Sequence, residues 1–167
     1  MTSYRPLRAG TKPVVVGAGG LSHGEHLVSC LALGGVGAVY GTRFLLTPES
    51  YYPEERKQVL LHAKEGSTIR SMAFDEARNT LDWPEGVDGR GIRNLTVKEF
   101  EAGLDDKAAR QATYMEAEGR GDPERLIVWA GTGVGNMDKI AAAGDVVREL
   151  EQQALRSMTQ ITAMFVV

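Results

Sequence analysis

The chain has 167 residues, of which 43% are hydrophobic and 25% charged, and its formal net charge is −3. This length suits one domain with a core of its own, and the mildly acidic balance argues against a basic surface for nucleic acid. Its single cysteine, Cys30, cannot form an internal disulfide and indicates a reducing compartment. Glycine is in excess: 20 of the 167 residues are glycine, a larger share than the typical value of about 7%.

The N-terminal residues carry no recognisable targeting signal. The first apolar stretch, at residues 14–16, is too short for the core of a signal peptide or for a membrane span. We therefore expect a cytoplasmic protein that associates neither with membranes nor with nucleic acid.

Residues 12–47 are expected to form a strand–helix–strand unit. Residues 13–17 contain a short β-branched run without polar alternation, which is typical of a fully buried strand of a parallel sheet. Ser22 and Glu25 have the spacing of a capping box, so Ser22 is the predicted N-cap of the next helix. A second buried strand is predicted at 36–40, and the length of the crossover favours a parallel pair.

Residues 48–167 are expected to form a mostly helical region with loops, in the same single domain. A pair of acidic residues after Pro53, scattered glycines and helical apolar spacing mark its segments. In chain order these are a helix at 53–64, an extended segment at 68–74, an irregular loop at 79–94, helices at 96–103 and 105–118, a turn at 119–123, a glycine-rich loop at 131–135, and a long helix at 138–158 bent near Gly144.

Two glycine-bearing turns follow the two predicted strands, Gly19-Gly20 after the first and Gly41-Thr42 after the second. Backbone amides can point at an anion only where no Cβ blocks the approach, and the following helix contributes its positive end. A single glycine pair is equally well an ordinary tight turn. Two such turns at the carboxyl ends of neighbouring parallel strands predict a phosphate site, with the Thr42 hydroxyl as a further donor.

Two folds place a phosphate at such turns. The dinucleotide-binding fingerprint is nearly present at 17–22, but Ser22 stands in place of its third glycine. The second strand also ends in Gly41-Thr42-Arg43, where that fold requires an acid for the ribose. The sequence therefore favours the phosphate site formed after the last two strands of a (β/α)8 barrel.

The motifs together resemble the C-terminal half of the nitronate monooxygenases, also called 2-nitropropane dioxygenases. The similar segments occur in the family's order and span residues 12–156: VVVGAGGL at 14–21, ALG at 32–34, GTRFL at 41–45, GRGIRN at 89–94 and WAGTGVG at 129–135. The resemblance implies an α/β fold, a partial TIM (β/α)8 barrel containing its last two strands, followed by the mostly helical region.

The resemblance also implies FMN at the carboxyl end of the strands. Gly19 and Gly20 are expected to contact its phosphate, and the loop at 131–135 to lie near the ring system. The other side of the phosphate is expected to be wrapped by the four residues that end the second strand: Val39, Tyr40, Gly41 and Thr42.

In the family, nitronates or nitroalkanes are oxidised with O2 to carbonyl compounds and nitrite, the protein supplying a base. The family's catalytic histidine lies in a Gly-Gly-His segment that this sequence does not contain, so we assign no catalytic residue. We expect a truncated form, lacking the N-terminal half, that self-associates or associates with that half. Alternatives are another FMN barrel, such as an enoyl reductase, and a non-catalytic remnant.

The remaining candidates have structural interpretations beside functional ones. His23 and His26 are either solvated residues of a first helical turn or donors to an anion, and no residues have the spacing of a metal site. Arg43 either reaches a phosphate or forms a surface salt bridge. Cys30 is expected in the core, and Trp129 either anchors the core or lines the pocket.

Overall fold

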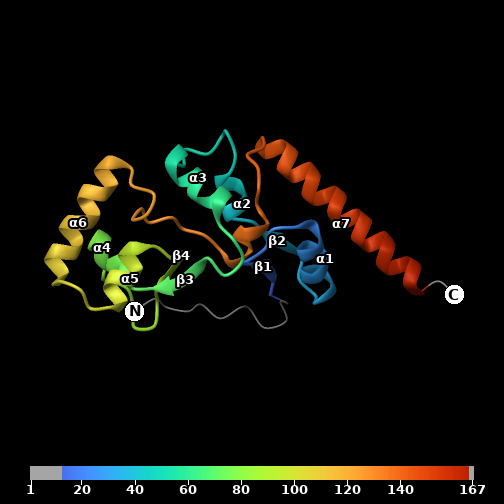
Figure 1. The fold of residues 1–167 in the computed structure, drawn as a ribbon. Coiled ribbons are helices and arrows are strands. Elements are labelled where there is room, and N and C mark those ends of the chain that lie inside the picture. Colours follow the sequence, from blue (N-terminus) through green and yellow to red (C-terminus); the bar gives the residue numbers. More distant parts are fainter. Residues whose placement is uncertain (1–12, 166–167) are drawn as a thin grey trace.

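The computed structural model describes residues 13–165, an α/β arrangement of helices around two small sheets (Figure 1). The four strands are β1 (Val16–Ala18), β2 (Gly37–Val39), β3 (Thr68–Ser71) and β4 (Gly89–Ile92). The helices are α1 (Gly24–Ala32), α2 (Thr42–Leu45), α3 (Glu54–His62), α4 (Ala73–Arg78), α5 (Leu95–Glu101), α6 (Lys107–Arg120) and α7 (Ala143–Phe165), with a 3-10 turn η1 (Thr132–Asn136).

The predicted strand–helix–strand unit is confirmed, because β1 and β2 pair in parallel with α1 as the crossover. Val16 pairs with Gly37, and Ala18 pairs with Val39. The prediction that both strands are fully buried is wrong for the described residues: Val16 in β1 is 45% and Val39 in β2 is 55% exposed. A β-branched run favours extended backbone, but burial requires packing partners, and within residues 13–165 this sheet has two strands only.

The helix α1 starts differently from the prediction. Its N-cap is His23, so the expected capping box of Ser22 and Glu25 is wrong. The His26 Nδ1 accepts hydrogen bonds from the amides of Ser22 (2.9 Å) and His23 (3.2 Å), which satisfies donors at the helix start. The Ser22 hydroxyl is engaged elsewhere, since it accepts a hydrogen bond from the Asn136 amide group at 3.1 Å.

The segment at 79–94, predicted as an irregular loop, contains β4. This strand pairs antiparallel with β3, with Thr68 opposite Ile92, and Gly91 forms a further bridge to Trp129. The extended segment predicted at 68–74 ends at Ser71, where α4 follows, and α2 was also not predicted. Local composition favours a loop here, but pairing with residues some twenty and forty positions away decides the structure.

Helices α5 and α6 lie close to their predicted positions because their caps are encoded locally. The Asn94 and Asp106 side chains accept hydrogen bonds from the amides of Val97 (3.2 Å) and Ala109 (2.9 Å). The helix α6 ends at Gly121, whose φ of +66° suits glycine, so the predicted turn at 119–123 begins two residues too early.

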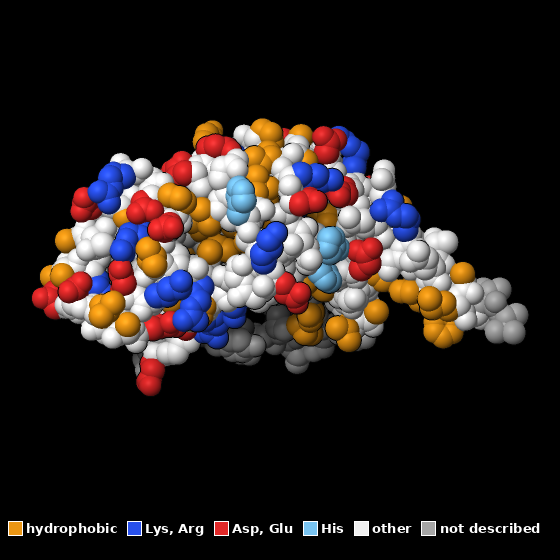
Figure 2. Space-filling model, viewed as in Figure 1, with side chains coloured by type: hydrophobic (Ala, Val, Ile, Leu, Met, Phe, Trp, Pro, Cys, Tyr) orange, Lys and Arg blue, Asp and Glu red, His pale blue; other side chains and the backbone are white. Residues whose placement is uncertain are grey.

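The C-terminal helix α7 begins at Ala143 rather than at 138, so it has its start, and not a bend, near Gly144. The residues before it are held by other segments, since the Ala141 amide donates to the Leu46 carbonyl. The first half of α7 packs on α1 through buried Val146, Leu150 and Ala154. Its last turns project from the body and carry exposed apolar side chains (Figures 1 and 2).

Two apolar clusters form the core. One joins α2, α3 and the segment that leads into η1, and the other joins α4, α5 and α6. The buried members of the first are Leu46, Leu60, Ile92, Leu126, Val128, Ala130, Val134 and Met137, and those of the second are Ala73, Phe74, Ala77, Val97, Tyr114 and Ile127. None of the helices of residues 13–165 is long and apolar enough to span a membrane.

Candidate functional site

The two glycine turns and the loop before η1 enclose an open cleft of about 540 Å³. The turns after β1 and β2 form two of its walls, and residues that are far away in sequence form the third. Its lining comprises Gly19, Gly20, Gly41, Thr42, Leu45, Arg90, Trp129, Ala130, Gly131 and Thr132.

Glycines allow the turn after β1 to approach the η1 loop closely. Gly19 and Gly20 have φ values of +89° and +73°, which side-chain-bearing residues rarely adopt. A Cβ on Gly20 would lie 2.5 Å from Oγ1 of Thr132, and one on Gly133 would overlap with the Gly20 carbonyl oxygen. At Gly19 a Cβ would meet no atom within 4 Å, so this glycine faces open space.

A hydrogen bond joins the segment that leads into η1, which is the third wall of the cleft, to the turn after β2. The Gly131 amide donates to Oγ1 of Thr42 at 2.9 Å. A threonine hydroxyl that accepts one hydrogen bond still carries its own proton, which it can donate to a ligand. Thr42 therefore both builds the cleft and retains the donor capacity that the sequence predicts for it.

The other two residues predicted around the phosphate, Val39 and Tyr40, do not line the cleft. Val39 is 55% exposed on β2. The Tyr40 hydroxyl donates to the His23 carbonyl at 2.9 Å, and partial burial raises the pKa of this phenol. In the structure Tyr40 therefore ties β2 to the start of α1.

Arg43 fits neither of its sequence interpretations. It is buried, and its Nη1 donates to the Lys139 carbonyl at 3.1 Å. It lines a separate cavity of about 30 Å³ with Ser22 and Asn136, which is large enough for a water molecule and not for a cofactor.

Trp129 combines the two roles considered for it. Its ring lies 5.3 Å from that of Phe74 in an edge-on arrangement, and it also lines the cleft. Cys30, expected in the core, is only partly buried and lies against Gly17, where a Cβ would overlap its sulfur. His23 and His26 sit at the start of α1, outside the lining of the cleft.

The sequence interpretation missed Arg90, which is the only charged residue that lines this cleft within residues 13–165. Its segment was singled out only as part of the family resemblance, within a predicted loop. The sequence signal that could have found it is the alternation of glycine with larger residues at 89–92. Glycines at alternate positions of a strand lie on one face, where other segments can approach closely.

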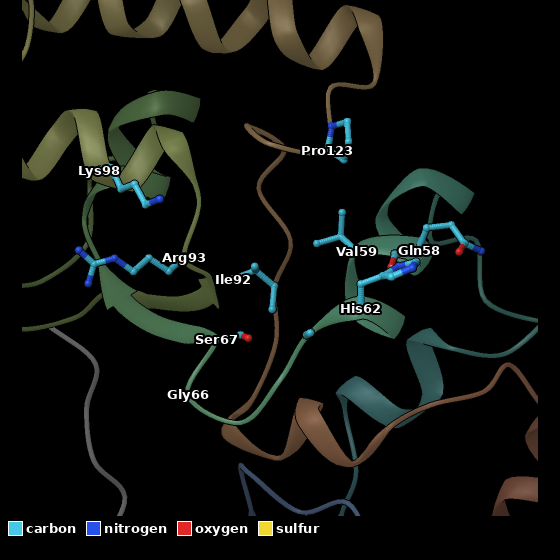
Figure 3. Close-up of a pocket in the computed structure, with 10 residues that line it drawn as sticks. Gln58, Val59, His62, Gly66, Ser67, Ile92, Arg93, Lys98 and Pro123 are labelled. Carbon is cyan, nitrogen blue, oxygen red and sulfur yellow. The ribbon is translucent and has the colours of Figure 1, made fainter.

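A larger hollow of about 660 Å³ lies elsewhere, between α3 and α5 (Figure 3). Lys98 and Arg93 border it on one side, and Val59 and His62 on the other (Figure 3). Arg93 is already paired with Glu101, and Gly66 is the one glycine among the lining residues of this hollow, whereas two glycine turns meet at the cleft. Nor do the described residues contain a group of three metal-binding side chains.

The sequence profile of the nitronate monooxygenase family matches residues 10–153. The chain belongs to the nitronate monooxygenase family. It is 36% identical over 152 residues to the nitronate monooxygenase of Neurospora crassa, covering 90% of this chain and 40% of that protein. It is 29% identical to a nitronate monooxygenase of Metarhizium robertsii, covering 89% of this chain and 43% of that protein.

Two solved structures have a fold similar to that of this chain. FabK of Thermotoga maritima superposes with a TM-score of 0.74 at 19% identity, over 93% of this chain and 48% of FabK. Nitroalkane oxidase of Streptomyces ansochromogenes superposes with a TM-score of 0.71 at 24% identity, over 92% of this chain and 43% of the oxidase. The chain of this family member thus spans less than half the length of the relatives that it matches.

Proposed function

We propose that this chain forms the FMN-phosphate side of an enzyme that oxidises nitronates or nitroalkanes with O2 to carbonyl compounds and nitrite. The observation that carries the proposal is the cleft in which both predicted glycine turns meet the 129–132 segment. Membership of the nitronate monooxygenase family supports the reaction class.

The residues of the cleft suit a flavin phosphate. Gly19 and Gly41 have no atom within 4 Å of a Cβ position, so a phosphate can come close to their backbone. Thr42 offers its hydroxyl proton from the opposite turn. Leu45 and Ala130 contribute apolar surface to the lining.

Bound FMN supplies the redox chemistry, while the protein positions it and its substrate. In this proposal Gly19, Gly20, Gly41 and Thr42 hold the phosphate, and Gly131 keeps the third wall free of side-chain atoms. We assign no catalytic base to the described residues, because the three histidines lie outside the lining of the cleft. Val39 and Tyr40 have the supporting role of shaping the second strand.

We further propose that β1 and β2 are two neighbouring strands of a (β/α)8 barrel, with the base supplied by the remainder of the barrel. Their parallel pairing and the exposed valines on the strands support this arrangement. The curated relatives, of which the match covers 40% and 43%, have the length to contain the other strands.

Flavin binding and nitrite release test the two parts separately. Titration of FMN into the purified chain should quench flavin fluorescence with a saturable profile, and riboflavin should bind more weakly because it lacks the phosphate. Absence of FMN binding would contradict the cofactor assignment for this chain. Nitrite formation from a nitronate should appear on adding the N-terminal portion of a related enzyme. Oxidation of NADPH with an enoyl thioester instead would favour the enoyl reductase alternative.

A further inference from the structure

The glycines of β4 decide which way Arg90 faces. A Cβ on Gly89 would overlap with the Trp129 ring, and one on Gly91 would lie 3.0 Å from the Phe74 ring. Both glycines therefore face these aromatic residues. Because successive residues of a strand point to opposite faces, Arg90 and Ile92 face the other way. Ile92 enters the core there, and Arg90 lines the cleft.

Arg90 also differs from neighbouring arginines in its partners. Arg70 and Arg93 form ion pairs with Asp88 and Glu101. Among residues 13–165 no acidic side chain pairs with Arg90, whose Nη1 donates to the Thr68 hydroxyl at 3.3 Å. A guanidinium has five N–H donors, so most of those of Arg90 remain for a ligand.

A partly buried guanidinium with no carboxylate partner is suited to a small oxyanion, which it can bind through two parallel hydrogen bonds. The same cleft presents glycine backbone and the Thr42 hydroxyl, which favour negative charge as well. We propose that Arg90 binds the oxyanion of the ligand in this cleft. This inference rests on the proposed function, under which the oxyanion is either the phosphate of FMN or the negatively charged nitro group of a nitronate.

Inorganic phosphate tests the anion site without any flavin. In the 15N-labelled full chain, the Nε–Hε resonance of Arg90, assigned by its loss in Arg90→Lys, should shift saturably as phosphate replaces chloride at constant ionic strength. The resonance of Arg70, which is paired and lies outside the cleft lining, should not follow it. An Arg90 resonance that moves no more than that of Arg70 would overturn the proposal.

Flavin and nitronate titrations then distinguish the two sources. If Arg90 binds the cofactor phosphate, Arg90→Gln should weaken FMN binding by about tenfold or more and leave riboflavin unchanged. If it binds the substrate, the preference for FMN over riboflavin should persist, while the FMN-loaded chain loses affinity for a nitronate and not for the neutral nitroalkane. Arg90→Lys should show a smaller loss.

Arg70→Gln is the matched control, because it removes a guanidinium from the paired strand β3 without touching the cleft. Unchanged FMN, riboflavin and nitronate affinities in folded Arg90→Gln would also contradict the role of Arg90. A wild-type chain that binds phosphate at Arg90 but no flavin would contradict the proposed cofactor and leave the anion site standing.

Discussion

The Gly131 amide and the Thr42 hydroxyl, 89 positions apart, meet in a hydrogen bond of 2.9 Å. This bond joins the turn after β2 to the segment that leads into η1, and so holds together two walls of the cleft. Loss of the hydroxyl should therefore affect both the stability of the protein and its ligand site.

Thr42→Val should lower the free energy of unfolding by about 0.5–1.5 kcal/mol, because the Gly131 amide loses its acceptor. It should also weaken FMN binding, since the site loses a donor. Urea denaturation and flavin titration measure the two effects. Thr42→Ser, which keeps the hydroxyl, is the control, and equal losses in both variants would argue against the hydrogen bond as the cause.

Gly41→Val should remove FMN binding while leaving the fold intact. Gly41 has a φ of −90°, which a valine can adopt, and its Cβ would meet no atom within 4 Å, so the side chain would extend into open space at the cleft. Gly37→Val, also free of close contacts but outside the cleft lining, is the control. FMN affinity that is unchanged in Gly41→Val would refute the phosphate site at this turn.

Gly24→Ala should destabilise the contact between α1 and α7. The Gly24 amide donates to the Gln153 side chain at 2.7 Å, and a Cβ here would lie 2.5 Å from the Ala154 amide nitrogen. Such overpacking against backbone costs about 1–3 kcal/mol. Limited proteolysis should cut α7 earlier, and the melting temperature should fall.

Gly119→Ala is the control, and it should raise the melting temperature instead of lowering it. This glycine lies within α6, and its Cβ would meet no atom within 4 Å, so alanine should stabilise the protein by about 0.5–1 kcal/mol. Equal melting temperatures for Gly24→Ala and Gly119→Ala would contradict the close contact between α1 and α7.

The ion pair of Glu99 and Arg125 should make stability depend on acidic pH. Two hydrogen bonds of 2.6 and 2.7 Å join their side chains, and the hydrogen bonding to Arg125 lowers the Glu99 pKa below its usual 4.5. The stabilisation is thus complete above that value and is lost as the pH falls through the lower pKa of the folded state. Glu99→Gln should cost about 0.5–1.5 kcal/mol at pH 7.

Urea denaturation at pH 7 and pH 3 measures this dependence, and the difference between Glu99→Gln and wild type should shrink at pH 3. Glu116→Gln is the control, because Glu116 and Arg120 form a pair that is 68% and 63% exposed. A loss in Glu99→Gln that stays the same at both pH values would contradict the ionic origin of the effect.

Exposed valines that precede β1 and β2 should make the isolated chain self-associate. Val14 and Val36 are mostly exposed beside a sheet that has two strands within the described residues, and open edges of this kind pair with other chains. Sedimentation velocity should show association that increases with concentration and decreases in Val14→Lys/Val36→Lys. Val87→Lys, at a separate exposed position in the loop before β4, should associate like wild type.

The sequence by itself determined the strand–helix–strand unit, helices α5 and α6 and the residues of the glycine turns. The β-branched runs predict β1 and β2, Asn94 and Asp106 are encoded caps of α5 and α6, and the motifs indicate the family. These features depend on neighbours in the chain, so local pattern is sufficient to predict them.

Only the tertiary structure decided what surrounds those turns. The pairing of β3 with β4, the hydrogen bond from Gly131 to Thr42 and the position of Arg90 all join residues that are distant in sequence. Local propensity carries no information on such contacts, because their energy comes from groups that meet only when the chain is folded. For the same reason the sequence did not predict that the Tyr40 hydroxyl bonds to the start of α1. Nor did it predict that Arg90, in a segment whose composition indicates a loop, lines the cleft.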